Sequence, residues 1–175
     1  RIEDLNDFAN TLSTENKSRV IIVTDACHSG KLADKHAKAA FLVGEDLAKV
    51  KANEIRITAC ASDQLSNEGE AWGGGRGVFS YYLINGLSGL ADQKDDKIVT
   101  TGEISDFLVS SFTNDKIIKE SNLKQTPVLS SGSKITPLAK VDSPTLLKLK
   151  ENLLHNDLNP DAFEIPEQPF DYFFS

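Results

Sequence analysis

The chain has 175 residues, 39% of them hydrophobic and 26% charged, which is an ordinary composition for one compact globular domain. Its net charge of −7 argues against nucleic acids and membrane surfaces as partners, because both attract clustered lysine and arginine. No apolar run approaches the roughly 20 residues of a membrane-spanning helix, and two cysteines provide no disulfide framework. These features favour a reducing compartment, and we expect a cytoplasmic protein.

The chain begins at Arg1 and contains no methionine. We therefore expect a piece of a longer protein, and a signal peptide upstream would change the compartment.

The first sixty residues are predicted to form a short helix and two strands. Apolar residues at helical spacing within residues 5–12 give one face of a helix. Val20–Asp25 contains five consecutive β-branched residues, which predict a buried strand of a parallel sheet, and Ser29-Gly30 then makes a tight turn. Residues 31–51 show no strand pattern and are predicted to be a loop with some helix. Ile55–Cys60 is the second predicted strand.

The middle of the chain is predicted to be helical. Gly73–Gly77 is a flexible turn, because consecutive glycines cost too much entropy inside an element. Apolar residues within 79–90 form the inward face of a helix, and 92–97 is a charged surface loop. Thr100 and Glu103 have the spacing of a capping box at the start of another helix. The apolar face of that helix comprises Ile104, Phe107, Leu108 and Phe112.

The last fifty residues are predicted to contain one strand and one helix. Pro127 fits an edge strand or the start of a strand. Ser143-Pro144 is predicted to be an N-cap followed by a first-turn proline, opening a helix that stops before Asn159-Pro160. The aromatic tail 161–175 is expected to pack in extended form on the domain, and the alternative is a docking strip for a partner.

Four motifs in a fixed order resemble one family of enzymes. Asp25-Ala26-Cys27-His28-Ser29-Gly30 resembles the nucleophile motif of the caspase-like cysteine peptidases, the clan of caspases, metacaspases and clostripain, and above all its metacaspase branch. Residues 57–68, 77–82 and 125–129 resemble three later segments of the same family. The resemblance covers about residues 3–131 and implies a caspase-like, mostly parallel sheet flanked by helices, here without its first strands. Residues 1–140 would be the C-terminal part of the peptidase domain, and 141–175 a helix with an acidic, aromatic tail.

The resemblance implies that Cys27 is a catalytic nucleophile. The thiol would follow the carboxyl end of a strand, where α/β sheets build their sites. Cysteine peptidases also need a histidine, which in this family belongs to a His-Gly motif upstream of the nucleophile. The chain contains no His-Gly, and His28, His36 and His155 do not match it. We expect the catalytic histidine on a segment outside this chain, which would therefore be a partner of it.

The resemblance also implies a preference for basic substrates. Asp25 leaves the predicted strand on the same face as Cys27 and corresponds to the aspartate that binds Arg or Lys in the first specificity pocket. Ser62 and Asp63 resemble the loop that shapes the substrate cleft. We expect cleavage of proteins or peptides after Arg or Lys through a Cys27 thioester, without nucleic-acid or membrane partners. Several lysines lie within residues 31–51, where an enzyme that cuts after basic residues would find a substrate in its own chain. We therefore expect self-processing, and the alternative is that these are ordinary surface lysines.

Calcium is the one cofactor that the resemblance raises, and none is required for the chemistry. Glu3, Asp4 and Asp34 correspond only roughly to acidic residues that bind calcium in some metacaspases. Calcium needs six to eight oxygen ligands, and scattered acids equally fit a solvated surface.

Two other functions stay open from the sequence. One is a catalytically inactive caspase-fold scaffold or sensor, with the tail as its docking element. The other is a cysteine transferase or redox protein built on Cys27 and Cys60. If the chain is instead a peptidase, we expect Cys60 to have a structural or redox role and not a catalytic one.

Overall fold

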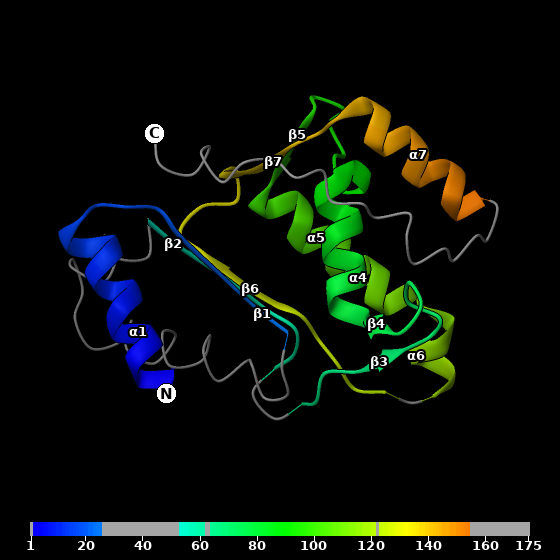
Figure 1. The fold of residues 1–175 in the computed structure, drawn as a ribbon, viewed down its shortest axis with the longest axis horizontal. Coiled ribbons are helices and arrows are strands. Elements are labelled where there is room, and N and C mark those ends of the chain that lie inside the picture. The colour runs from blue at the N-terminus through cyan, green and yellow to red at the C-terminus, as the bar shows by residue number, and fades with distance from the viewer. Residues whose placement is uncertain (1, 26–52, 62–63, 122, 155–175) are drawn as a thin grey trace.

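The computed structural model describes residues 2–25, 53–61, 64–121 and 123–154 and has a mixed α/β architecture (Figure 1). Its main sheet has three strands in the order β1-β2-β6. β1 runs parallel to β2 and β6 runs antiparallel to β2. The predicted α/β class is confirmed, and the first two predicted strands are both present and pair in parallel. The three strands are Val20–Thr24, Glu54–Thr58 and Val128–Ser131.

Helices lie on both sides of this sheet, with α1 on one side and α4 and α5 on the other (Figure 1). Two small antiparallel pairs, β3-β4 and β5-β7, complete the strands. The helices are α1 (Ile2–Asn10), α4 (Val78–Asn85), α5 (Thr101–Asn114), α6 (Lys116–Glu120) and α7 (Ser143–Leu154), with π-helical turns η1 (Thr11–Glu15) and η2 (Gly86–Leu90). The paired short strands are β3 (Glu68–Gly69) with β4 (Arg76–Gly77), and β5 (Ile98–Thr100) with β7 (Pro137–Lys140).

The hydrophobic core lies between β2 and the pair α4 and α5. Both faces of β2 are buried, and its residues alternate between the apolar Ile55 and Ile57, which belong to the core, and the polar Glu54, Arg56 and Thr58. The predicted inward faces of the two helices are confirmed, because their apolar side chains form one cluster with β2. The central members of this cluster are Ile55, Ile57, Phe79, Leu83, Ile104, Leu108 and Phe112.

Local signals in the middle of the chain are confirmed. The capping box at the start of α5 is present, with the Thr100 hydroxyl accepting from the Glu103 N–H and Glu103 Oε2 accepting from the Thr100 N–H at 2.9 Å. Gly73, Gly74 and Gly75 have φ of 65°, 78° and 98°, so the turn uses the left-handed conformation that favours glycine. β6 begins directly after Pro127, as the sequence predicts.

Two predictions about exposure and capping are wrong. β1 is not buried, because it pairs with β2 alone within the described residues, and Ile21 and Val23 are 42% and 50% exposed. The N-cap of α7 is Asp142 and not Ser143, since the Asp142 carboxylate accepts from the Thr145 N–H at 3.0 Å.

The predicted helix near the N-terminus is confirmed as α1, but most of its apolar face is open. Ala9 is buried, whereas Phe8 is 62% exposed. The part of the chain that the structure describes contains no helix that could cross a membrane. The loop predicted at 31–51, the stop before Asn159-Pro160 and the tail 161–175 lie outside the described residues.

Candidate functional site

The candidate site lies at the carboxyl ends of β1 and β2. The two strands stay in register to their last residues, with Thr24 opposite Thr58. One further hydrogen bond, from the Ala59 N–H to the Thr24 carbonyl at 2.9 Å, extends this pairing. Asp25 therefore leaves β1 at the same edge at which Cys60 leaves β2. Open α/β sheets place ligand sites at this edge, because loops diverge there from the ends of the strands.

The Asp25 carboxylate is held by two hydroxyl groups from distant parts of the chain. Ser66 Oγ donates to Asp25 Oδ1 at 2.5 Å, and Ser80 Oγ donates to Asp25 Oδ2 at 2.6 Å. Ser66 lies in the loop after β2, and Ser80 lies in the first turn of α4. Each carboxylate oxygen thus has one fixed donor, which orients the group without neutralising its charge.

Gly77 is the residue whose size permits this arrangement. A Cβ atom added there would lie 2.5 Å from Asp25 Oδ2. Any larger residue would have to displace the carboxylate or the start of α4, so glycine is needed here for close approach.

Gln125 fixes the loop that carries Ser66. Its buried amide accepts from the backbone N–H of Asn67 at 2.8 Å and donates to the carbonyl of Ala59 at 2.9 Å. The Val78 N–H donates to the Asn67 carbonyl at 3.0 Å, which ties the same loop to the start of α4. One side chain therefore connects the end of β2, the Ser66 loop and the segment before β6.

A second cluster anchors α4 from behind. Asp115 Oδ2 accepts from Trp72 Nε1 at 2.8 Å and from the Tyr82 hydroxyl at 2.7 Å, while Oδ1 caps α6 by accepting from the Ile118 N–H at 2.9 Å. Burial would raise the pKa of Asp115, but these hydrogen bonds outweigh burial and hold it below its ordinary value. Burial and the bond to Asp115 raise the pKa of Tyr82. The cluster is structural, because it joins the glycine turn, α4 and α6.

The arrangement at Asp25 can bind a cation. Asp25 is exposed, carries a negative charge, and keeps carboxylate lone pairs beyond the two that the serines occupy. A guanidinium or ammonium group is the complement of such an oriented carboxylate. Within the described ranges, no group of three His, Cys, Asp or Glu side chains is arranged to hold a metal ion.

The structure describes one of the predicted site residues in full. Asp25 lies at the predicted edge, whereas Cys27, Ser62 and Asp63 fall outside the described residues. The calcium candidate Asp34 lies outside them too, and only the backbone of Asp4 is described, in α1. Cys60 is fully buried, and its thiol donates to the Gln64 carbonyl at 3.3 Å.

Three residues of the site were missed by sequence reasoning. Ser66 and Ser80 lie inside motifs that resemble the peptidase family, and Gln125 begins another. Their membership in these motifs is the only signal that could have identified them, because nothing local marks a serine that donates to a carboxylate 41 or 55 residues away.

Comparison of the chain with family models, curated proteins and solved structures finds no match. The functional interpretation therefore depends on the motifs and on the geometry around Asp25.

Proposed function

We propose that this chain is the nucleophile-bearing part of a caspase-like cysteine endopeptidase that cleaves after Arg or Lys. The observation that carries the proposal is the exposed Asp25 carboxylate, oriented by Ser66 and Ser80 two residues before a cysteine. What distinguishes Asp25 from the structural Asp115 is its exposure, because an exposed carboxylate held in a fixed orientation is ready to receive a cationic side chain when the substrate arrives.

The sheet topology supports a caspase-like fold for this domain. The parallel pair β1 and β2, with the antiparallel β6 beside β2, is compatible with the mostly parallel sheet of such a fold. Within the described residues β1 is an edge strand with exposed side chains, so a further strand can pair with it.

The chemistry proposed for Cys27 is acyl transfer. Its thiolate attacks the carbonyl carbon after the basic residue, and the peptide nitrogen leaves as an amine once it has received a proton. Water then hydrolyses the thioester and releases the carboxylic acid and the thiol. The histidine that moves these protons would come from a segment outside this chain.

Asp25 would determine which peptide bond is cut. When the guanidinium of a substrate arginine pairs with Asp25, the backbone carbonyl of that arginine would lie near Cys27, which is two residues after Asp25 in this chain. An apolar side chain at that position would leave the carboxylate unpaired, and the site would reject it.

The test is cleavage of matched fluorogenic peptides ending in Arg, Lys, norleucine or Asp by the intact protein, with or without calcium. We expect cleavage after Arg and Lys that is lost in Cys27→Ala. Asp25→Asn is nearly isosteric and should lower kcat/KM for the basic peptides by on the order of 10³-fold. Its Cys27 should still react with a small thiol reagent at an unchanged rate.

Two results would contradict the proposal. Unchanged cleavage after Arg in Asp25→Asn would remove Asp25 from the specificity site. No cleavage of any peptide by a folded protein with a titratable Cys27 thiol would favour the inactive scaffold or sensor.

A further inference from the structure

A groove lies over the antiparallel pair β5 and β7, at the end of the molecule away from Asp25. Its volume is about 480 Å³, which is within the range of clefts that bury a small ligand. Val99 is fully buried in the core, so Ile98, the residue before it in β5, points away from the core. Ile98 is 39% exposed, so apolar surface is open to solvent here within the described part of the chain. The apolar residues that line the groove are Ile98, Pro137, Leu138 and Ala139.

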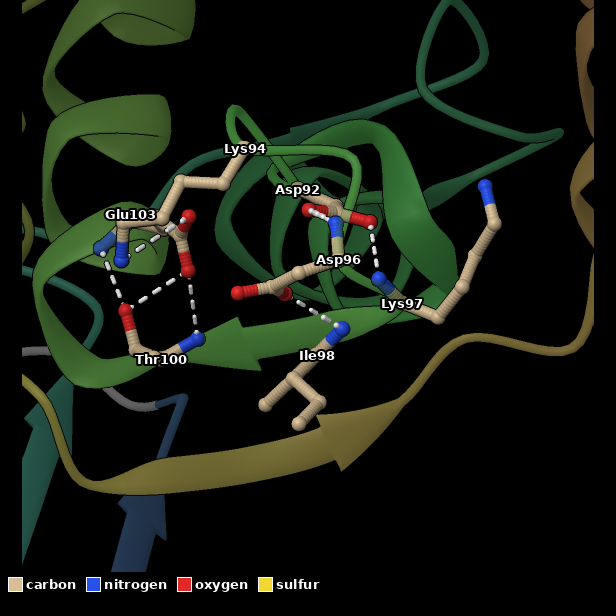
Figure 2. Close-up of polar contacts among 7 residues, drawn as sticks. All are labelled: Asp92, Lys94, Asp96, Lys97, Ile98, Thr100 and Glu103. Atoms are coloured by element: carbon tan, nitrogen blue, oxygen red, sulfur yellow. Dashed lines mark hydrogen bonds and ion pairs between the residues drawn. The ribbon is translucent and has the colours of Figure 1, made fainter.

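Two lysines border this apolar surface. Lys140 is opposite Ile98 in the antiparallel pairing, so the two side chains share one face of the pair. Lys97, next to Ile98 in the chain, is the second, and it also pairs with Asp95. Asp96 lines the groove too, but its carboxylate accepts from the Ile98 N–H at 3.0 Å (Figure 2). The complement of such a groove is an apolar or aromatic side chain close to a carboxylate.

The wall of the groove that precedes β5 is fixed by its own backbone. The Asp92 carboxylate accepts from the N–H groups of Asp96 at 3.2 Å and Lys97 at 3.0 Å (Figure 2). β5 then ends at Thr100, the N-cap of α5. A ligand can therefore bind here without the entropy cost of ordering this loop.

The helix α7 holds the following part of the chain close to the groove. It begins at Ser143, three residues after the end of β7 at Lys140. A Cβ atom added at Gly89 would lie 2.6 Å from Val141 and 3.2 Å from Leu146, so the start of α7 is packed closely on η2. α7 has 12 residues and is therefore about 18 Å long. Residues 155–175 span up to about 70 Å when extended, which is ample to return along α7 to the groove.

The segment 161–175 has the composition that the groove requires. It lies outside the described residues, and its sequence contains four carboxylates and no lysine or arginine. Asp161 and Phe163 are two residues apart, as are Asp171 and Phe173, so an extended chain presents a carboxylate and a ring on the same side. Because the segment is tethered to α7, its concentration at the groove is on the order of millimolar, which favours it over a free partner. Its aromatic residues are Phe163, Phe170, Tyr172, Phe173 and Phe174.

We propose that the groove over β5 and β7 is the docking site of this chain's own segment 161–175. Aromatic side chains of the segment would cover Ile98 and Pro137, and its carboxylates would pair with Lys97 and Lys140. The groove is separate from Asp25, so failure of the peptidase proposal would not affect this one.

The test is hydrogen–deuterium exchange of the intact protein, with a synthetic peptide of residues 161–175 as the unbound reference. We expect amides within 161–175 to exchange about tenfold more slowly in the protein than in the peptide. Ile98→Asp removes the apolar contact and adds a like charge, so it should restore the exchange rate of the peptide. Lys140→Glu should accelerate exchange by about threefold, because exposed ion pairs are weak.

Ile117→Asp and Lys148→Glu are the matched controls. Ile117 is also 39% exposed but lies on α6, and Lys148 is an exposed lysine on α7. Both variants should leave exchange within 161–175 unchanged. Exchange within β2 should be the same in every variant, which checks that each protein is folded.

Carbodiimide cross-linking gives a second readout, because it joins a lysine to a carboxylate only where the two are in contact. We expect cross-links from Lys97 or Lys140 to carboxylates of 161–175. Wild-type exchange at the rate of the free peptide, equal acceleration by Ile98→Asp and Ile117→Asp, or cross-links only to lysines outside the groove would overturn the proposal. Protection that increases with protein concentration would place the segment on a second copy and would overturn docking within one chain.

Discussion

The surroundings of Asp25 and the loop Asp92–Glu103 hold their carboxylates in opposite ways. Asp25 receives its donors from residues 41 and 55 positions away. Asp92 and Asp96 receive theirs from backbone groups no more than five residues away. The first arrangement exists only when β1, the Ser66 loop and α4 are packed together, whereas the second forms wherever the loop folds. The contacts of Asp25 thus depend on the packing of distant segments, whereas those of Asp92 and Asp96 are made within one loop.

Asp115 sharpens this comparison, because it combines both kinds of contact. Its distant donors are Trp72 and Tyr82, and its local donor is the Ile118 N–H. Asp115→Ala should lower the free energy of unfolding by about 3 kcal/mol, since it leaves a buried indole N–H unpaired and removes a helix cap. Chemical denaturation at pH 7 measures this, with the exposed Asp106→Ala as control. A loss equal to that of the control would contradict the structural role of Asp115.

The Asp115→Ala variant also predicts how the stability of the protein depends on pH in the acidic range. The pKa of Asp115 is lowered in the folded protein, so its carboxylate stabilises the fold above the unfolded-state pKa of about 3.9. That contribution is lost as pH falls through the folded-state pKa. The difference in stability between wild type and Asp115→Ala should therefore shrink from pH 7 towards pH 2, and an unchanged difference would refute the assigned hydrogen bonds.

Gln125 tests the dependence of the Asp25 site on distant segments. Gln125→Ala leaves the Asn67 N–H and the Ala59 carbonyl without their partner, at a cost of about 2 kcal/mol. Because Asn67 is next to Ser66, the variant should also raise KM for Arg peptides. The exposed Gln93→Ala is the control. Lower stability with unchanged KM would show that the Ser66 loop is positioned by other contacts.

Thr100 tests the local arrangement and has the smallest expected effect. Thr100→Ala removes the hydroxyl half of the capping box and should cost about 1 kcal/mol, while Thr100→Ser should retain most of the stability. Denaturant midpoints of the three proteins measure the difference. If alanine and serine are equally destabilising, the threonine methyl rather than the hydroxyl stabilises α5.

The sequence predicted the architecture well where partners are close in the chain. The capping box, the glycine turn and the inward faces of α4 and α5 follow from residues separated by a few positions. It failed at β1, where Ile21 and Val23 are exposed, because composition does not tell how many neighbours a strand has. It also placed the N-cap of α7 one residue late, since Asp142 and Ser143 are both good caps.

For the candidate site, the sequence by itself determined the identity and order of the groups: Asp25 at the end of a predicted strand, with Cys27 two residues later. Only the tertiary structure decided which groups hold Asp25. Ser66, Ser80 and Gln125 reach the site because β2, α4 and the segment before β6 pack around one edge. The physical reason is that a hydrogen bond needs its atoms within about 3 Å, and for residues far apart in the chain only packing determines that distance.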